Sequence, residues 1–138
     1  MAGIEVTAWG HVGIRIHDLD RSRAFYEMLG FEFIVGPVGP EPVAILRHPC
    51  GIEVNLIINA PEADTPNVLM DVPVKKPGIT HLAIEVRSLE GVQESLDEAG
   101  IRVTEGPVDF GTGYWGLFCR DPDGNVIEFD EWRGEGPR

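Results

Sequence analysis

The hydrophobic pattern of the first half of the chain predicts a strand, a helix and three further strands. Apolar and polar residues alternate between Trp9 and His17, as in a half-buried strand. Asp18 is then a predicted N-cap for a helix whose apolar stripe ends at Leu29, with Gly30 as its left-handed C-terminal residue. The later strands are expected at residues 31–35, 43–47 and 52–59, after turns that include residues 36–42 and 48–51. This half therefore predicts the order βαβββ.

The second half repeats this pattern. Alternation returns over residues 80–87, Ser88 takes the N-cap position, and a helical stripe from Leu89 ends at Gly100. Strands are expected at residues 101–104, 114–120 and 125–131, with a glycine-rich loop at residues 105–113. The second half therefore predicts a second βαβββ module.

The two halves are copies of one sequence unit. Aligning His11 with His81 places residues 11–38 on residues 81–108 without a gap. The identical pairs are His11/His81, Ile14/Ile84, Leu19/Leu89, Gly30/Gly100, Gly36/Gly106, Pro37/Pro107 and Val38/Val108. The alignment resumes at Arg47/Arg120, Pro49/Pro122 and Gly51/Gly124, after an insertion before Tyr114. An internal repeat of this length predicts a tandem fold.

We therefore expect a single α+β domain, residues 1–138, built from two tandem βαβββ modules. The modules span residues 8–59 and 78–132, and the proline-rich residues 60–77 connect them. Each module has its helix on one face of its sheet, and we expect the opposite faces to form a curled mixed sheet around a shared metal cavity.

Composition narrows the possible partners. The formal net charge of −12 argues against nucleic acid and anionic membrane surfaces, and no apolar run approaches the ~20 residues of a membrane span. The N-terminus has no targeting pattern, so a cytoplasmic location is expected. Cys50 and Cys119 are too few for a disulfide framework and are interpreted as free thiols. A small-molecule partner is the remaining expectation.

Strand alternation selects the residues that face the cavity. Because the helix-facing positions are apolar, His11 and His81 point to the opposite face, and in the last strand Glu128 and Asp130 do the same. Asn55 is the counterpart of Glu128 in the first copy, and Glu53 lies two positions earlier on the same face. Two histidines and a carboxylate are a typical divalent-metal set. We interpret His17 and His48 as surface residues.

These motifs resemble the vicinal oxygen chelate superfamily, which includes glyoxalase I, methylmalonyl-CoA epimerase and extradiol dioxygenases. The most specific segments are residues 10–14, 18–30, 80–84 and 120–129. The resemblance implies that His11, His81 and Glu128 bind a divalent metal ion, of which Zn, Ni, Co, Mn and Fe are candidates. It also implies a homodimer.

The fourth metal ligand of that family, commonly glutamate or glutamine, falls on Asn55. Asparagine is shorter than glutamine by one methylene, so three alternatives remain open. The metal lies closer to the strand of Asn55, a water molecule fills the gap between Asn55 and the metal, or Glu53 takes the fourth ligand position.

The leading hypothesis for function is a glyoxalase-like lyase or isomerase that moves a proton next to a carbonyl of a small metabolite. Glu128 or Glu53 is the candidate catalytic base, and the candidate substrate-binding residues are Arg47, Tyr114 and Trp115. The first alternative is a non-haem Fe(II) extradiol-type dioxygenase. The second is a resistance protein that binds a drug without catalysis.

Overall fold

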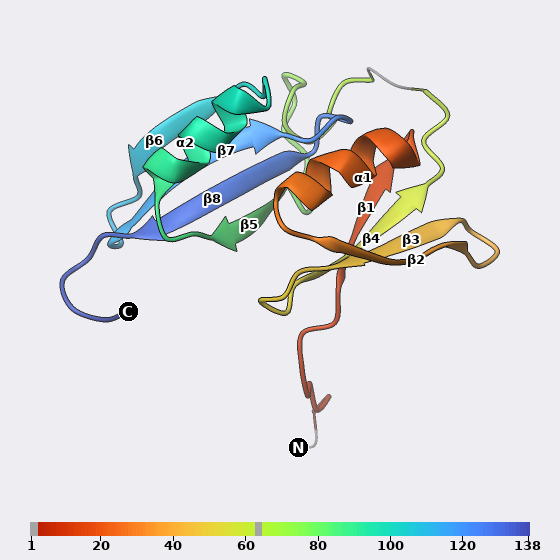
Figure 1. Cartoon of the computed structure of the whole chain (residues 1–138), viewed down its shortest axis with the longest axis horizontal. Helices are drawn as coiled ribbons and strands as arrows, with labels where there is room; N and C mark the ends of the chain where they lie inside the picture. Colours follow the sequence, from red (N-terminus) through yellow and green to blue (C-terminus); the bar gives the residue numbers. More distant parts are fainter. Residues whose placement is uncertain (1–2, 63–64) are drawn as a thin grey trace. The chain divides into compact units, whose positions relative to one another are not determined.

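The chain forms two compact units, each with one helix and one four-stranded sheet over the described residues (Figure 1). The structure is a computed structural model and describes residues 3–62 and 65–138. Unit 1 is Met1–Ala63 and unit 2 is Asp64–Arg138. Both units have the order βαβββ, which confirms the predicted tandem fold.

Unit 1 contains a mixed sheet with the strand order β1-β4-β3-β2. Strand β1 pairs with β4 in parallel, and the other neighbours are antiparallel. The elements are β1 (Val12–Ile16), α1 (Leu19–Met28), β2 (Glu32–Val38), β3 (Val43–Arg47) and β4 (Glu53–Ile58).

Helix α1 begins and ends where the sequence predicts. The Asp18 side chain accepts a hydrogen bond from the backbone N–H of Arg21 at 3.0 Å, and Gly30 follows the helix with a φ of +98°. Phe25 and Tyr26 of this helix are buried, in edge-to-face contact with each other. The core of this unit also contains Ile14, Ile16, Phe31, Ala44, Leu46, Val54 and Leu56.

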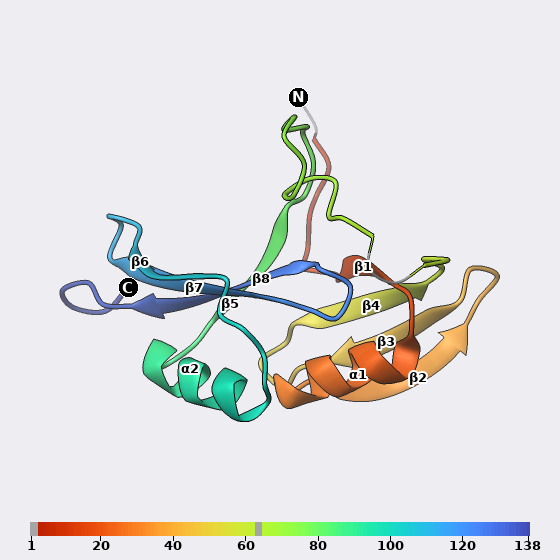
Figure 2. The same ribbon diagram turned by 90° about the horizontal axis from the view of Figure 1, so that it is seen from above.

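Unit 2 repeats this topology, with the strand order β5-β8-β7-β6. Strand β5 is parallel to β8, and β8, β7 and β6 are antiparallel neighbours. In this unit, too, the helix lies against one face of the sheet (Figure 2). The elements are β5 (His81–Glu85), α2 (Leu89–Glu98), β6 (Glu105–Asp109), β7 (Tyr114–Arg120) and β8 (Val126–Trp132).

Most buried side chains of unit 2 lie on the predicted helix-facing side of their strands, whereas Val126 is buried on the opposite face of β8. Leu89 and Leu96 from α2 are buried, as are Leu117, Cys119, Ile127 and Phe129 from the sheet. The alternate residues of β8, Glu128 and Asp130, therefore lie on the face opposite the helix. We call this helix-free face of each sheet the open face.

The predicted strand at residues 101–104 is wrong, because β6 lies at Glu105–Asp109, in the segment expected to be a loop. The equivalent strand β2 likewise continues to Val38, beyond the turn expected at Gly36. Gly36 and Gly106 both have positive φ, and the strand pairing shifts register around them. Such a bulge lets an edge strand continue through a proline.

The part of the connecting segment that belongs to unit 2 makes hydrogen bonds to the β7–β8 region of the same unit. The Asn67 side chain donates to the carbonyl of Gly124 at 3.1 Å, and Arg120 donates to both carboxylate oxygens of Asp71 at 2.7 and 2.9 Å. Residues 67–71 are therefore held against the turn between β7 and β8.

The helices of the described segments, 3–62 and 65–138, are too short and too polar to cross a membrane.

Candidate functional site

The open face of unit 1 contains Asn55, and strand alternation would continue to His11, just before β1, on the same side. His11 immediately precedes β1 and is exposed, and the backbone register pairs Gly13 with Asn55. The Oδ1 atom of Asn55 is buried and has no hydrogen-bond partner among the described residues. A buried carbonyl oxygen without a donor is costly, so this atom is suited to a ligand that supplies positive charge.

Glu53 lies on the same face but is bonded to a neighbouring side chain. Its Oε1 atom accepts hydrogen bonds from Arg47 Nη2 at 2.8 Å and from Arg47 Nε at 3.2 Å. The two residues are directly opposite each other on β4 and β3. Of the two candidates for the fourth ligand position, Asn55 therefore has the oxygen without a partner.

The open face of unit 2 brings His81 and Glu128 together. His81 begins β5, and Ala83, two residues later, is paired with Glu128 on β8. His81 Nε2 lies 3.8 Å from Glu128 Oε1, and the other ring nitrogen, Nδ1, lies 2.8 Å from Thr80 Oγ1. Thr80 thus orients the imidazole while Nε2 faces the carboxylate.

Glu128 is half-buried, and its burial raises the pKa of the carboxyl group to about 7. The negative charge of Asp130, a hydrogen bond with its carboxyl group and then the charge of Glu105 add to the rise in the pKa. Burial also raises the pKa of Asp130, whose Oδ1 atom is buried without a hydrogen-bond partner in the described residues. Asp130 had no predicted role, although strand alternation places it beside Glu128.

Aromatic rings flank the carboxylates of unit 2. Phe118 is paired with Glu128 across β7 and β8, and its ring centroid lies 6.3 Å from those of His81 and Phe110. Phe110 packs on Gly116, where an added Cβ would lie 2.2 Å from the ring. Neither Phe110 nor Gly116 was predicted as part of the site, although a glycine within a strand signals such a close approach.

The structure separates the two aromatic residues expected to bind substrate. Tyr114 lies on the open face, where its hydroxyl donates a hydrogen bond to Glu85 Oε1 at 3.3 Å. Trp115 alternates onto the helix-covered face with Leu117, and its ring contacts the guanidinium of Arg133. Only Tyr114 shares a face with Glu128.

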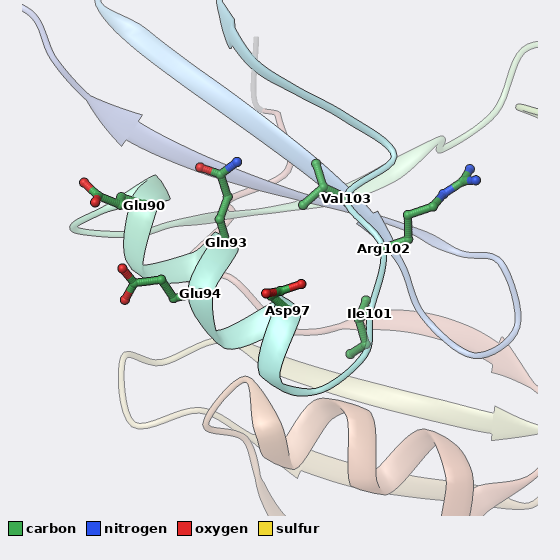
Figure 3. A pocket seen from close by; sticks show the side chains of 7 residues that line it. All are labelled: Glu90, Gln93, Glu94, Asp97, Ile101, Arg102 and Val103. Carbon is green, nitrogen blue, oxygen red and sulfur yellow. The ribbon is translucent and has the colours of Figure 1, made fainter.

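Unit 2 also has a hollow of about 530 Å³ beside α2 (Figure 3). It contains none of the predicted site residues, and acidic, neutral polar, basic and aliphatic side chains all contribute to its lining. Its lining residues are Glu90, Gln93, Glu94, Asp97, Ile101, Arg102 and Val103.

Within residues 3–62 and 65–138, no group of three or more histidine, cysteine, aspartate or glutamate side chains is arranged to hold a metal ion. The His81–Glu128 pair supplies two such side chains.

Comparison with known proteins assigns the family. Residues 8–129 match the model of the Glyoxalase/Bleomycin resistance protein/Dioxygenase superfamily. The chain belongs to this superfamily. The match includes the first module and residues 78–129 of the second, and it confirms the resemblance inferred from the sequence.

Two curated relatives and one solved structure illustrate the superfamily relationship. A glyoxalase domain-containing protein of Mycosarcoma maydis is 30% identical over 135 residues, which cover 94% of this chain and 71% of that protein. Glyoxylase I 4 of Arabidopsis thaliana is 30% identical over 129 residues, covering 91% and 71%. The glyoxalase family protein from Enterococcus faecalis has a TM-score of 0.68 and 31% identity, covering 88% and 94%.

Proposed function

We propose that this superfamily member is a divalent-metal-dependent lyase or isomerase of glyoxalase type, which transfers a proton next to a carbonyl of a small metabolite. The observation that carries the proposal is the equivalence of the two open faces. His81 and Glu128 lie together in unit 2, and Asn55, at the position equivalent to Glu128, has a buried oxygen without a partner.

The donor set fits a divalent ion of the Zn, Ni, Co, Mn or Fe class. His11 and His81 would supply nitrogen ligands, Glu128 a carboxylate oxygen and Asn55 an amide oxygen. The proposal takes one pair from each unit, from the same chain or from two chains of a homodimer. When bound, the metal would supply Lewis-acid stabilisation of negative charge on the substrate oxygens.

The remaining chemistry belongs to side chains of unit 2. The Glu128 carboxylate would take the proton from the carbon next to the carbonyl and return it. Phe118 and Phe110 would exclude water from that carboxylate, because their rings cover the neighbouring strand positions. Glu53 was the other candidate base, and its two hydrogen bonds with Arg47 favour Glu128 for this role.

The test is deuterium exchange at the carbon next to the carbonyl of hydroxyketones and acyl thioesters in D₂O, followed by NMR with each candidate metal. We expect exchange that requires metal and that falls about 10²-fold or more in Glu128→Gln, the range of a general base. His17→Ala is the matched histidine control and should retain exchange. Absence of exchange across the whole panel with every metal would contradict the proposal.

One observation favours a second candidate, a non-haem Fe(II) dioxygenase. The position equivalent to Glu128 holds an amide, so the predicted set has two histidines and a single carboxylate, as in the facial triad of iron oxygenases. Oxygen uptake with catechols and ferrous iron, in the absence of deuterium exchange, would establish this alternative.

A further inference from the structure

We propose that Glu85 and Tyr114, on the open face of unit 2, form a binding site for the guanidinium group of a small-molecule ligand. We call these two residues the cation site. In this structure the guanidinium of Arg138 fills it. The inference goes beyond the proposed reaction, because it concerns binding within one unit and needs neither the metal nor unit 1.

The guanidinium of Arg138 is held by a carboxylate and an aromatic ring. Arg138 Nη1 donates a hydrogen bond to Glu85 Oε2 at 2.6 Å, and Arg138 Cζ lies 5.2 Å from the centroid of the Tyr114 ring. The Tyr114 hydroxyl donates to the other carboxylate oxygen, Oε1, at 3.3 Å. A charge-assisted hydrogen bond combined with a cation–π contact suits a guanidinium group. Arg138 therefore shows which chemical group the site accepts.

The ring of Tyr114 is held by neighbouring residues of unit 2. Tyr114 is paired with Trp132 across β7 and β8, and their rings make an edge-to-face contact with centroids 5.0 Å apart. The Trp132 ring in turn lies against Gly113 and Gly134, where an added Cβ would overlap it. None of these contacts involves Arg138, so we expect the site to persist when that guanidinium leaves.

Arg138 is weakly anchored at the cation site. It lies on the segment after β8, where the chain turns back (Figure 1). Its side chain is 64% exposed and that of Glu85 is 49% exposed. Because an ion pair with this exposure contributes little free energy, the guanidinium of a ligand can displace it.

Unit 1 has a different arrangement at the equivalent positions. The repeat aligns Glu85 with Arg15 and Tyr114 with Glu41. The Asn59 side chain joins these two residues, since it accepts a hydrogen bond from Arg15 Nε at 2.8 Å and donates one to Glu41. Unit 1 thus carries its own guanidinium on the sheet and has no aromatic ring at these positions. The pairing of a carboxylate with a ring is therefore particular to unit 2.

The experiment compares benzylguanidinium with benzylurea, an uncharged molecule of similar shape. Both are titrated into the isotope-labelled full chain without metal, and the backbone amide shifts of Glu85 and Tyr114 give the dissociation constants. In Arg138→Gln, benzylguanidinium should bind about tenfold more tightly than benzylurea. It should also bind about threefold more tightly than it does to the wild type, because the exposed Arg138 ion pair no longer competes.

Two further variants test the assignment. Adding Glu85→Gln to Arg138→Gln removes the carboxylate and should abolish the preference for benzylguanidinium over benzylurea. Arg133→Gln is the matched control, because Arg133 belongs to the same segment but bonds to Glu131 and contacts the Trp115 ring. This control should bind both probes as the wild type does.

Equal binding of the two probes to Arg138→Gln, or a preference that survives Glu85→Gln, would overturn the inference. A gain in Arg133→Gln equal to that in Arg138→Gln, or no shift with either probe, would overturn it as well. The titrations involve no metal and no turnover, so their outcome is separate from that of the deuterium-exchange test. Absence of exchange with intact guanidinium binding contradicts only the proposed reaction, whereas exchange without guanidinium binding contradicts only the inference.

Discussion

Asn55 and Glu128 occupy equivalent positions and differ in charge, and their neighbours differ in the same way. Asp130 follows Glu128 on the open face of β8, whereas Ile57 follows Asn55 on that of β4. The proposed metal set therefore has its carboxylate charge in unit 2 and a neutral amide in unit 1. Within the proposed function, this asymmetry favours the carboxylates of unit 2 for proton transfer.

The two cysteines differ in burial and should differ in reactivity. Cys50 is exposed, whereas Cys119 has no exposed surface, and burial raises the pKa of its thiol to about 12, with the charge of Asp121 adding to the effect. Since the thiolate is the reactive form, we expect iodoacetamide at pH 8 to label one thiol per native chain. Mass spectrometry would locate the label on Cys50.

Cys50→Ser is the control for this labelling. The native variant should remain unlabelled, and both cysteines of the wild type should react once the chain is unfolded in guanidinium. Labelling of native Cys119 at the rate of Cys50 would show that this part of the core is open.

The helices and strands whose bounds are marked by nearby cap or turn residues were predicted best. The strands at residues 43–47 and 114–120 match β3 and β7, and the caps Asp18 and Ser88 lie where they were expected. These signals act over a few residues, so they do not depend on the rest of the chain. The β6 prediction was wrong because the pairing of an edge strand through a Gly-Pro bulge depends on the neighbouring strand.

The segment 67–71 should open more often when its ion pair is removed, although the Asn67–Gly124 hydrogen bond remains. Arg120 lowers the pKa of Asp71, chiefly by hydrogen bonding, so the charged carboxylate stabilises the fold above the unfolded-state pKa of about 3.9. This contribution is lost as the pH falls through the lower folded-state pKa. Asp71→Asn should therefore be less stable than the wild type at pH 7, and the difference should shrink toward pH 2.

Urea unfolding at the two pH values measures this difference, and hydrogen exchange should show faster exchange at residues 67–71. Asp97→Asn removes the same charge from α2 without changing the Arg120 contact, so its loop exchange should match that of the wild type. A stability difference for Asp71→Asn that stays constant with pH would refute the assigned role of the ion pair.

At the level of the whole molecule, each unit has its own core, and the proposed metal ligands come from both. A metal that binds only the folded chain stabilises it by about 2.7 kcal/mol when present at 100 times its dissociation constant. We therefore expect chelation by EDTA to lower the melting temperature of the metal-loaded protein. His11→Ala and His81→Ala should each abolish this effect, while His17→Ala retains it.

Metal content by elemental analysis and melting curves with and without chelator provide the measurement. If the purified protein bound none of the candidate metals and its melting temperature were unaffected by EDTA, the drug-binding alternative would be favoured over catalysis. The cytoplasmic location and the homodimer remain predictions.

Sequence pattern was sufficient for the tandem βαβββ order and for the strand face on which His81, Asn55 and Glu128 lie. Both follow from repeat spacing and from the two-residue period of a strand, which are properties of neighbouring residues. The engagement of Glu53 by Arg47, the Asp71–Arg120 ion pair and the packing of Phe110 on Gly116 required the folded structure. Strand register and the path of loops create these contacts, and hydrophobic periodicity encodes neither.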